Sequence, residues 1–180
     1  MVMSCIYLVR HAAPDMERTD IPYDVPPGPA LTAVGEAQAR LIGEYLLPLR
    51  IARLYSSHFL RAQQTAAIAA DQVGLAVHIE PGIGEWHASE RARDVVARVE
   101  PVLERIKQES ESEGPVCMVS HGGPIGVMLR KLGMDRAQVD VYRSTFGGST
   151  PSPHAGVWRI TANSDRWEYA LVFQPPMSCS

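Results

Sequence analysis

Short apolar runs alternate with longer amphipathic segments along most of this chain, and that alternation restricts the fold more than any other feature. The apolar runs are rich in strand-forming residues and cover positions 5–9, 51–56, 75–81 and 115–120. The segments between and after them carry apolar residues at helical spacing, at positions 32–46, 60–74, 89–112 and 121–133. Because alternating strands and helices form mostly parallel sheets, this order predicts a three-layer α/β/α fold with a mostly parallel central sheet and helices on both faces.

Local signals mark where the predicted helices start, bend and end. Thr32 is an expected N-cap and Gly74 an expected C-cap. Pro101 lies inside the segment 89–112, and we expect a kink or a break there because proline removes a backbone donor. The acidic stretch "ESESEG" that follows is expected to be a solvated, frayed helix end.

Two further apolar runs, at 156–162 and 168–174, predict an antiparallel hairpin. Residues 144–155 are rich in Ser, Gly, Thr and Pro and are expected to form a loop. Without repeats or an internal linker, we expect a single domain over residues 1–174 and a disordered tail over 175–180.

The composition argues against several classes of protein. The chain is 46% hydrophobic and 21% charged with a net charge of −3, so it has no basic field for nucleic acid or anionic lipid. It has no bilayer-length apolar run and no signal-peptide pattern, so we expect no membrane association and a cytoplasmic location. Cys5, Cys117 and Cys179 lack disulfide-framework or zinc spacing, and the first two are expected in the core.

Each predicted strand is followed by polar residues that can do chemistry. They are Arg10 and His11 after the first strand, Ser57 and Arg61 after the second, Glu85 after the third, and His121 and Gly122 after the fourth. Because the carboxyl ends of parallel strands meet at one edge of a sheet, two histidines, two arginines and a carboxylate are expected around one crevice.

Such a crevice is suited to a phosphate group. Paired arginines match the oxygens of a dianion, and Gly122 can offer a backbone N–H at a helix N-terminus. There is no acidic cluster for magnesium and no phosphate-binding glycine loop, so we expect phosphoryl transfer without a metal or other cofactor. His11 can attack phosphorus, and the neighbouring Arg10 should lower its pKa. Glu85 can protonate the leaving oxygen if bound phosphate raises its pKa.

Five segments together resemble the histidine phosphatase superfamily, also called the phosphoglycerate mutase-like family. They are "LVRHAAP", "LTAVGEAQA", "LYSSHFLRAQQTA", the Glu85 loop and "VSHGGPIGVML", in the same order from about residue 4 to residue 132. The resemblance implies the phosphoglycerate mutase-like fold. It also implies that His11 is the phosphorylated nucleophile, that Glu85 is the proton donor, and that Arg10, Arg61 and His121 form the phosphate pocket.

The chain departs from this family at two positions after the nucleophile. Ala12 stands where the family usually has glycine, and a helical or extended φ would accept its methyl group. Glu17 stands where the family often has an asparagine that touches phosphate, so that contact is expected to be lost or supplied by another group. The next helix follows Glu85 almost at once, so we expect a minimal cap and a pocket wall formed largely by the long loop 12–31.

Other polar residues near these motifs have simpler interpretations. His58 is expected to face solvent at the pocket rim, and His87 and His154 to be solvated loop residues rather than substrate contacts. Glu90 is the alternative to Glu85 as a loop carboxylate, and we favour Glu85 as the proton donor.

We therefore predict a phosphatase that hydrolyses a phosphate monoester through phospho-His11. Mutase activity is less favoured, since a mutase must shield its intermediate from water in a capped pocket. The alternatives are a protein phosphohistidine phosphatase, whose imidazole leaving group needs no proton donor, and a non-catalytic phospho-ligand binding module on the same fold. The expected partner is a phosphorylated small molecule of open identity, and a homodimer is compatible with the sequence.

Overall fold

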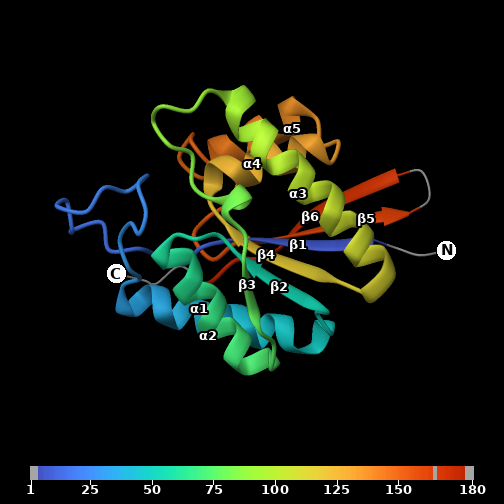
Figure 1. The fold of residues 1–180 in the computed structure, drawn as a ribbon, viewed down its shortest axis with the longest axis horizontal. Helices are drawn as coiled ribbons and strands as arrows, with labels where there is room; N and C mark the ends of the chain where they lie inside the picture. Colours follow the sequence, from blue (N-terminus) through green and yellow to red (C-terminus); the bar gives the residue numbers. More distant parts are fainter. Residues whose placement is uncertain (1–3, 164–165, 177–180) are drawn as a thin grey trace.

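A computed structural model describes residues 4–163 and 166–176 of the chain (Figure 1). The strands are β1 (Ser4–Arg10), β2 (Arg53–Ser56), β3 (Val77–Ile79), β4 (Val116–Ser120), β5 (Val157–Asn163) and β6 (Arg166–Phe173). The helices are α1 (Ala33–Leu46), α2 (Leu60–Val73), α3 (Ala92–Glu113), α4 (Gly122–Lys131) and α5 (Arg136–Thr145), with short 3-10 turns η1 (Leu47–Leu49) and η2 (Pro81–Ile83).

The strands form one sheet in the order β3-β2-β4-β1-β5-β6. The first four pair in parallel, and β5 and β6 add an antiparallel edge. Helices α1 and α2 cover one face, and α3, α4 and α5 lie on the other (Figure 1). The predicted three-layer, mostly parallel α/β/α fold and its closing hairpin are confirmed.

The continuous apolar run of β1 results from burial on both faces of the sheet. Ile6 and Leu8 pack in a core cluster with residues of α3, α4 and α5. Tyr7 and Val9 pack in a second cluster with residues of α1 and α2. Since successive strand side chains point to opposite faces, a strand covered by helices on both sides needs apolar residues at every position.

Two predicted helix caps are confirmed by their geometry. The Thr32 hydroxyl accepts a hydrogen bond from the Gly35 N–H at 3.0 Å, where α1 begins. Gly74 ends α2 with a φ of 71°, a left-handed conformation that glycine adopts without steric cost.

Of the kink or break expected at Pro101, the break is absent, and the stretch expected to be a frayed, solvated end is helical to Glu113, with Glu111, Ser112 and Glu113 exposed. Helix α3 runs unbroken to Glu113, because a buried apolar face that includes Val99 and Ile106 offsets the one lost backbone bond. Ser110, inside the acidic stretch, is buried and bonds the start of β1: its hydroxyl accepts from the Cys5 N–H at 2.7 Å and donates to the Cys5 carbonyl at 2.9 Å.

Helix α5 was not predicted, and it shortens the loop expected over 144–155. It begins with a capping box in which Asp135 and Gln138 bond each other's backbone N–H groups. Val139 is its one buried side chain, so the helix lacks the apolar repeat on which the sequence prediction relied. Of the tail expected over 175–180, residues 177–180 lie outside the described part of the chain, as does Cys179.

The sheet brings the ends of β1, β2 and β4 to the same edge, because these three strands are parallel neighbours. Loop 12–31 starts at this edge after β1, and α4 begins there after β4. Within the described residues, none of the helices combines the length and apolar character needed to cross a membrane.

Candidate active site

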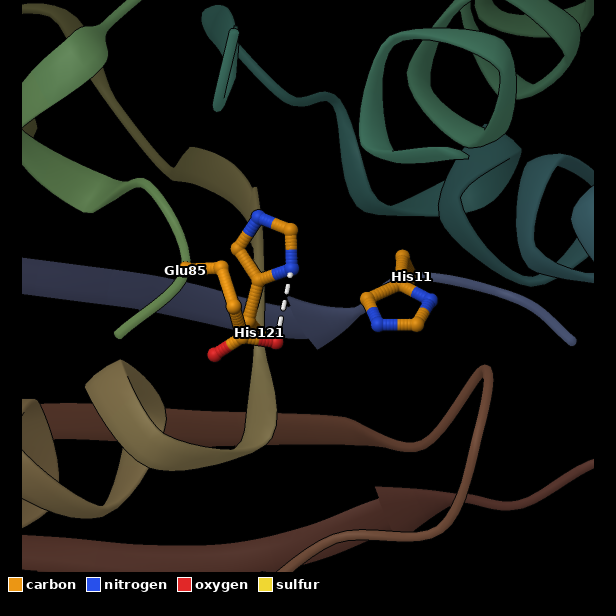
Figure 2. Close-up of side chains that lie close together, drawn as sticks. All are labelled: His11, Glu85 and His121. Atoms are coloured by element: carbon orange, nitrogen blue, oxygen red, sulfur yellow. Dashed lines mark ion pairs between the residues drawn. The ribbon is translucent and has the colours of Figure 1, made fainter. Parts of the chain in front are cut away.

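His11, Glu85 and His121 converge at the carboxyl edge of the sheet (Figure 2). Each offers one side-chain atom, and these atoms lie within 4.8 Å of one another. His11 follows β1, His121 follows β4, and Glu85 lies in the loop after η2. The convergence expected from the strand order is therefore present in the fold, although the three residues are far apart in the chain.

The surroundings of His11 select one tautomer of its ring. Nδ1 lies 2.8 Å from the Ala12 carbonyl oxygen, which can only accept, so the proton is on Nδ1. The Nε2 lone pair lies 3.2 Å from the Arg61 Nε–H and 3.2 Å from the Tyr23 hydroxyl. The imidazole is fully buried and presents its unprotonated nitrogen to a guanidinium and a phenol.

Burial is the main reason that the pKa of His11 lies well below its usual value of 6.5. The neighbouring His121, Arg61 and Arg10 lower it further, in that order of effect. The expected direction of the pKa shift is confirmed, but Arg10 is a lesser cause than desolvation. His11 is neutral at physiological pH and keeps a lone pair on Nε2.

Arg61 joins the nucleophile candidate to the carboxylate. Its guanidinium donates to His11 Nε2, to Glu85 Oε2 at 3.2 Å and to the Tyr23 carbonyl oxygen at 3.0 Å. Arg61 is completely buried in the first turns of α2, and its carbon Cζ lies 4.0 Å from the centre of the Tyr23 ring. A buried guanidinium held from three sides is a rigid donor for an anion.

The Glu85 carboxyl group is ionised at neutral pH, contrary to the raised pKa that an acid catalyst needs. Burial raises its pKa, but His121, the Trp86 N–H and the charge of Arg61 outweigh burial and lower the pKa to about 2. The Trp86 N–H donates to Oε1 at 2.9 Å. The carboxyl can act as an acid only when a bound ligand reverses this balance.

His121 precedes the first residue of α4, and its Nδ1 faces Glu85. Its Nε2 lies 2.7 Å from the Ser57 hydroxyl, which also accepts from the Phe59 N–H. Its Nδ1 lies 3.4 Å from Glu85 Oε2 but forms no hydrogen bond within the described residues. Burial, opposed by Glu85 and assisted by both arginines, lowers the pKa of His121 to about 4. If Ser57 donates to Nε2, the Nδ1–H is free to bind an oxygen anion.

Arg10 and His154 are a linked pair on the other side of His11. Arg10 donates to the Ser152 carbonyl at 2.8 Å and to His154 Nε2 at 3.0 Å, whereas its buried Nε has no partner among the described residues. The expectation that His154 is a solvated loop residue is wrong: its ring lies 5.4 Å from that of His11, and burial lowers its pKa to about 4.

A pocket of about 290 Å³ opens over this cluster. It is lined by Arg10, Tyr23, Glu85, Trp86, Gly122, Gly123, Ser149 and Thr150. Gly122, the first residue of α4, allows Thr150 to approach: a Cβ at this position would lie 2.3 Å from the Thr150 hydroxyl oxygen. The His121 side chain does not cap α4, so its first N–H groups are available to an anion in the pocket.

Arg98 on α3 separates the roles of the two loop glutamates. Its guanidinium donates to the carbonyls of Gly82, Gly84 and Glu85 and to both oxygens of Glu90, at 2.7–3.0 Å. Glu90 therefore binds Arg98 and helps to hold the loop that carries both glutamates. The Glu85 carboxylate, not that of Glu90, lies on the side of His11.

Three sequence expectations about the pocket wall can be compared with the structure. Glu17 is exposed and does not contact His11, and the Tyr23 hydroxyl occupies the position beside Nε2. Ala12 is buried and has no positive φ, so its methyl group is accommodated as expected. His58 does not simply face solvent: it is half-buried, and its ring centre lies 4.9 Å from that of Phe59.

Tyr23 and His154 were not predicted as site residues, and Ser57, expected at the strand end, was given no role there. Tyr23 had a weak signal, as an aromatic residue in a long loop beside the nucleophile candidate. His87 stays in the loop, where its Nδ1 lies 2.6 Å from the Ser89 hydroxyl.

The three converging side chains include atoms that can bind a metal ion, but the charge around them disfavours one. Arg61 contacts both His11 and Glu85, and Arg10 lies on the far side of His11. A divalent cation among them would be repelled by two guanidinium groups, whereas an anion would be attracted. The sequence prediction of a site without a metal remains a prediction.

Comparison with known proteins gives one family for nearly the whole chain. The sequence model described as "Histidine phosphatase superfamily (branch 1)" matches residues 6–90 and 87–172. A curated protein of Yersinia enterocolitica named "Probable phosphoglycerate mutase GpmB" is 32% identical over 124 residues, 67% of this chain and 55% of that protein. The chain thus spans about half the length of this relative, and it spans 11% of a second curated relative.

Solved structures share the fold over most of both chains. A mycobacterial glucosyl-3-phosphoglycerate phosphatase superimposes with a TM-score of 0.72 at 20% identity, covering 92% of this chain and 97% of that one. A phosphoglycerate mutase from Bacillus anthracis superimposes with a TM-score of 0.72 at 15% identity, covering 94% and 92%. The predicted phosphoglycerate mutase-like fold is confirmed.

Proposed function

Because this chain belongs to the histidine phosphatase superfamily, branch 1, we propose that it hydrolyses a phosphate monoester through a covalent phosphate on His11. The observation that carries the proposal is the shared contact of Arg61: one guanidinium donates to the His11 lone pair and to the Glu85 carboxylate, both at 3.2 Å. A nucleophile, an anion-binding cation and a proton carrier therefore border the same small volume.

We place the phosphate of the substrate where several hydrogen-bond donors have no partner in the described part of the chain. Arg10 Nε, His121 Nδ1 and the first N–H groups of α4 have no other partner among the described residues. The phosphate takes the place of the Tyr23 hydroxyl beside His11 Nε2 and receives the Arg61 N–H groups. The donors without other partners neutralise the equatorial oxygens from the positions that they already hold, which favours the transition state of phosphoryl transfer.

The first chemical step transfers the phosphoryl group to the enzyme. The Nε2 lone pair of His11 forms a bond to phosphorus as the bond to the ester oxygen breaks. Glu85, protonated in the complex, gives its proton to that oxygen, so the alcohol leaves neutral. The proton arrives with an ester bound as its monoanion, and the remaining phosphate charge raises the Glu85 pKa from about 2.

The second step returns the enzyme to its starting state. Glu85, now a carboxylate, accepts a proton from water, and the water oxygen bonds to phosphorus as the P–Nε2 bond breaks. Only six residues lie between Glu85 and the start of α3 at Ala92, so no long insertion closes the pocket against water. Easy access of water favours hydrolysis over return of the phosphate to a second alcohol.

The test is release of inorganic phosphate from a panel of phosphorylated metabolites and p-nitrophenyl phosphate, in the presence of a chelator. His11→Ala should lose about 10³-fold or more of the wild-type rate, since no other group supplies the nucleophile. His78→Ala, which removes an exposed histidine of β3, is the matched control and should be unaffected. An alkaline detergent quench with a ³²P-labelled ester should trap an acid-labile, base-stable phosphoenzyme that His11→Ala does not form.

Other results would favour the rival functions. Near wild-type turnover by His11→Ala would overturn the mechanism. Phosphate release from a phosphohistidine protein but from no ester would favour the protein phosphohistidine phosphatase. Tight phosphate binding with no turnover of any substrate would favour a binding module.

A further inference from the structure

A second cavity, of about 510 Å³, lies beside the catalytic pocket and is larger than it. Its lining includes an aromatic residue, Trp86, two apolar residues, Val96 and Val127, and three cations, Arg130, Lys131 and Arg143. Trp86 lines both cavities, so they adjoin at its indole ring. The proposed reaction uses none of the three cations.

Helix α4 connects the two cavities along one face. Gly123 lines the catalytic pocket, and Gly126, Val127 and Arg130 line the second cavity. Residues three, four and seven positions apart share a helix face, so these side chains form one line. A rise of about 1.5 Å per residue places Arg130 about 10 Å along the axis from Gly123.

The cations at the far end of this line are only partly neutralised. Arg130 is exposed and forms no ion pair within the described residues. Lys131 pairs with Glu100 at 2.9 Å and Arg143 with Asp140 at 3.2 Å. One positive charge is therefore unmatched among the residues described at this end of the cavity.

The Arg143 guanidinium packs against α4 at Gly126. A Cβ at Gly126 would lie 3.1 Å from the Arg143 terminal nitrogen, so the absence of a side chain there admits the guanidinium. The buried Nε of Arg143 has no hydrogen-bond partner among the described residues. A buried unpaired donor is costly unless a ligand or water satisfies it.

We propose that this cavity binds the far end of the substrate's leaving group, and that this end carries a second negative charge on an apolar stem. The inference rests on the proposed function: the phosphate binds over His11, the stem passes Trp86 and lies against Val96 and Val127, and a carboxylate or second phosphate meets Arg130 and Arg143. The substrate class is a phosphate monoester with a second anion about 10 Å from the helix end that binds the phosphate.

The proposal is tested with ω-carboxyalkyl phosphates of increasing chain length, each paired with the ω-hydroxyalkyl phosphate of equal length. The wild type should prefer the carboxylate by about tenfold in kcat/KM, as expected for one charge-assisted contact. The preference should be largest at roughly six to eight methylene groups, because their extended length matches the separation of about 10 Å between Gly123 and Arg130 along α4. Arg130→Ala should abolish the preference through KM and leave hydrolysis of p-nitrophenyl phosphate unchanged.

A matched control variant separates the proposal about the second cavity from the phosphatase proposal. Arg40→Ala removes an exposed arginine from α1, on the other face of the sheet, and should keep the preference. Hydrolysis of every ester with no preference for the carboxylate, or a preference unchanged in Arg130→Ala, would overturn the inference and leave the phosphatase proposal intact.

If no ester is hydrolysed, the phosphatase proposal fails, and calorimetry still tests the cavity. A long-chain ω-carboxyalkyl phosphate should bind about tenfold more tightly to His11→Ala than to the His11→Ala/Arg130→Ala double variant. Equal affinities would overturn the inference. The affinity for α,ω-alkanediol bisphosphates of the same chain length, compared with that for the ω-carboxyalkyl phosphates, shows whether the cavity prefers a second phosphate or a carboxylate.

Discussion

Nδ1 of His11 lies 2.8 Å from the carbonyl oxygen of Ala12, the residue that follows it in the chain. Because the carbonyl only accepts, this contact places the ring proton on Nδ1 and leaves Nε2 with its lone pair toward the pocket. In the proposed mechanism, the backbone of one neighbour thus orients the ring for attack, and the side chain at position 12 takes no part in it.

The first prediction concerns the charge of this ring. Burial first, then His121 and the guanidinium groups of Arg61 and Arg10, lower the pKa of His11 well below 6.5, so the ring should stay neutral as pH falls through 6.5. Nitrogen-15 NMR of the free protein should show an Nδ1–H tautomer from pH 7.5 to pH 5.5, with the signals assigned by their loss in His11→Asn. A titration midpoint near 6.5 would contradict the structure.

The second prediction concerns how the free energy of unfolding depends on pH. The folded-state pKa values of His11, His121 and His154 are all lowered, the last two to about 4, so the unfolded chain binds more protons between about pH 4 and 6.5. The free energy of unfolding should be largest above pH 6.5 and fall as pH decreases, by roughly 2–4 kcal/mol per pH unit at the steepest point.

Urea unfolding at a series of pH values measures this dependence. His154→Gln should reduce the slope by about a third, since it removes one of three groups. His78→Gln, at an exposed position of β3, should leave it unchanged. A stability that is flat from pH 7 to pH 5 would show that these rings are not buried as described.

The third prediction is that Ala12→Gly preserves activity. The peptide carbonyl that orients His11 remains, so kcat/KM should stay within about twofold of wild type. The protein should lose about 1 kcal/mol of stability, because a buried methyl group is removed and the unfolded chain gains freedom. A large loss of kcat with an unchanged fold would mean that the methyl group itself positions the ring.

The fourth prediction tests the proposed role of Glu85 as proton donor separately from that of His11 as nucleophile. Glu85→Gln keeps the size of the side chain and its bond to Trp86 but cannot carry the proton. Hydrolysis of alkyl phosphates should fall about 10²–10⁴-fold, whereas p-nitrophenyl phosphate, whose leaving group needs no proton, should be much less affected. Equal losses on both esters would remove Glu85 from the role of acid.

The fifth prediction concerns Arg98 as a positioning residue for Glu85. Arg98→Lys removes the planar fork that binds three loop carbonyls and Glu90, so kcat on alkyl phosphates should fall about tenfold with little change in KM. Arg105→Lys, on the same helix but bonded to Glu80 and Glu109, should have no effect on activity.

A double-mutant cycle shows whether Arg98 acts through Glu85. In the Glu85→Gln background, Arg98→Lys should cost nothing further on alkyl phosphates, since the group that it positions is already inactive. Additive losses would mean that Arg98 affects activity by another route, such as general destabilisation of the loop.

The sequence alone was enough for the layered fold and for the residues at the strand ends. Both depend on local patterns: apolar runs of strand length, helical spacing and polar residues such as Arg10, Arg61 and His121 at the turns. A parallel sheet then brings distant strand ends together without further information. This is why His11 and His121, 110 positions apart, could be expected at one edge.

Only the tertiary structure decided which neighbours these residues have. No local pattern predicts that His154 contacts Arg10 or that Ser110 bonds β1, and only a weak signal places Tyr23 beside His11. The low pKa of Glu85 likewise depends on Arg61 and His121, which come from other elements. Burial and pairing are properties of distances between segments remote in the chain, and those distances exist only once the helices have packed onto the sheet.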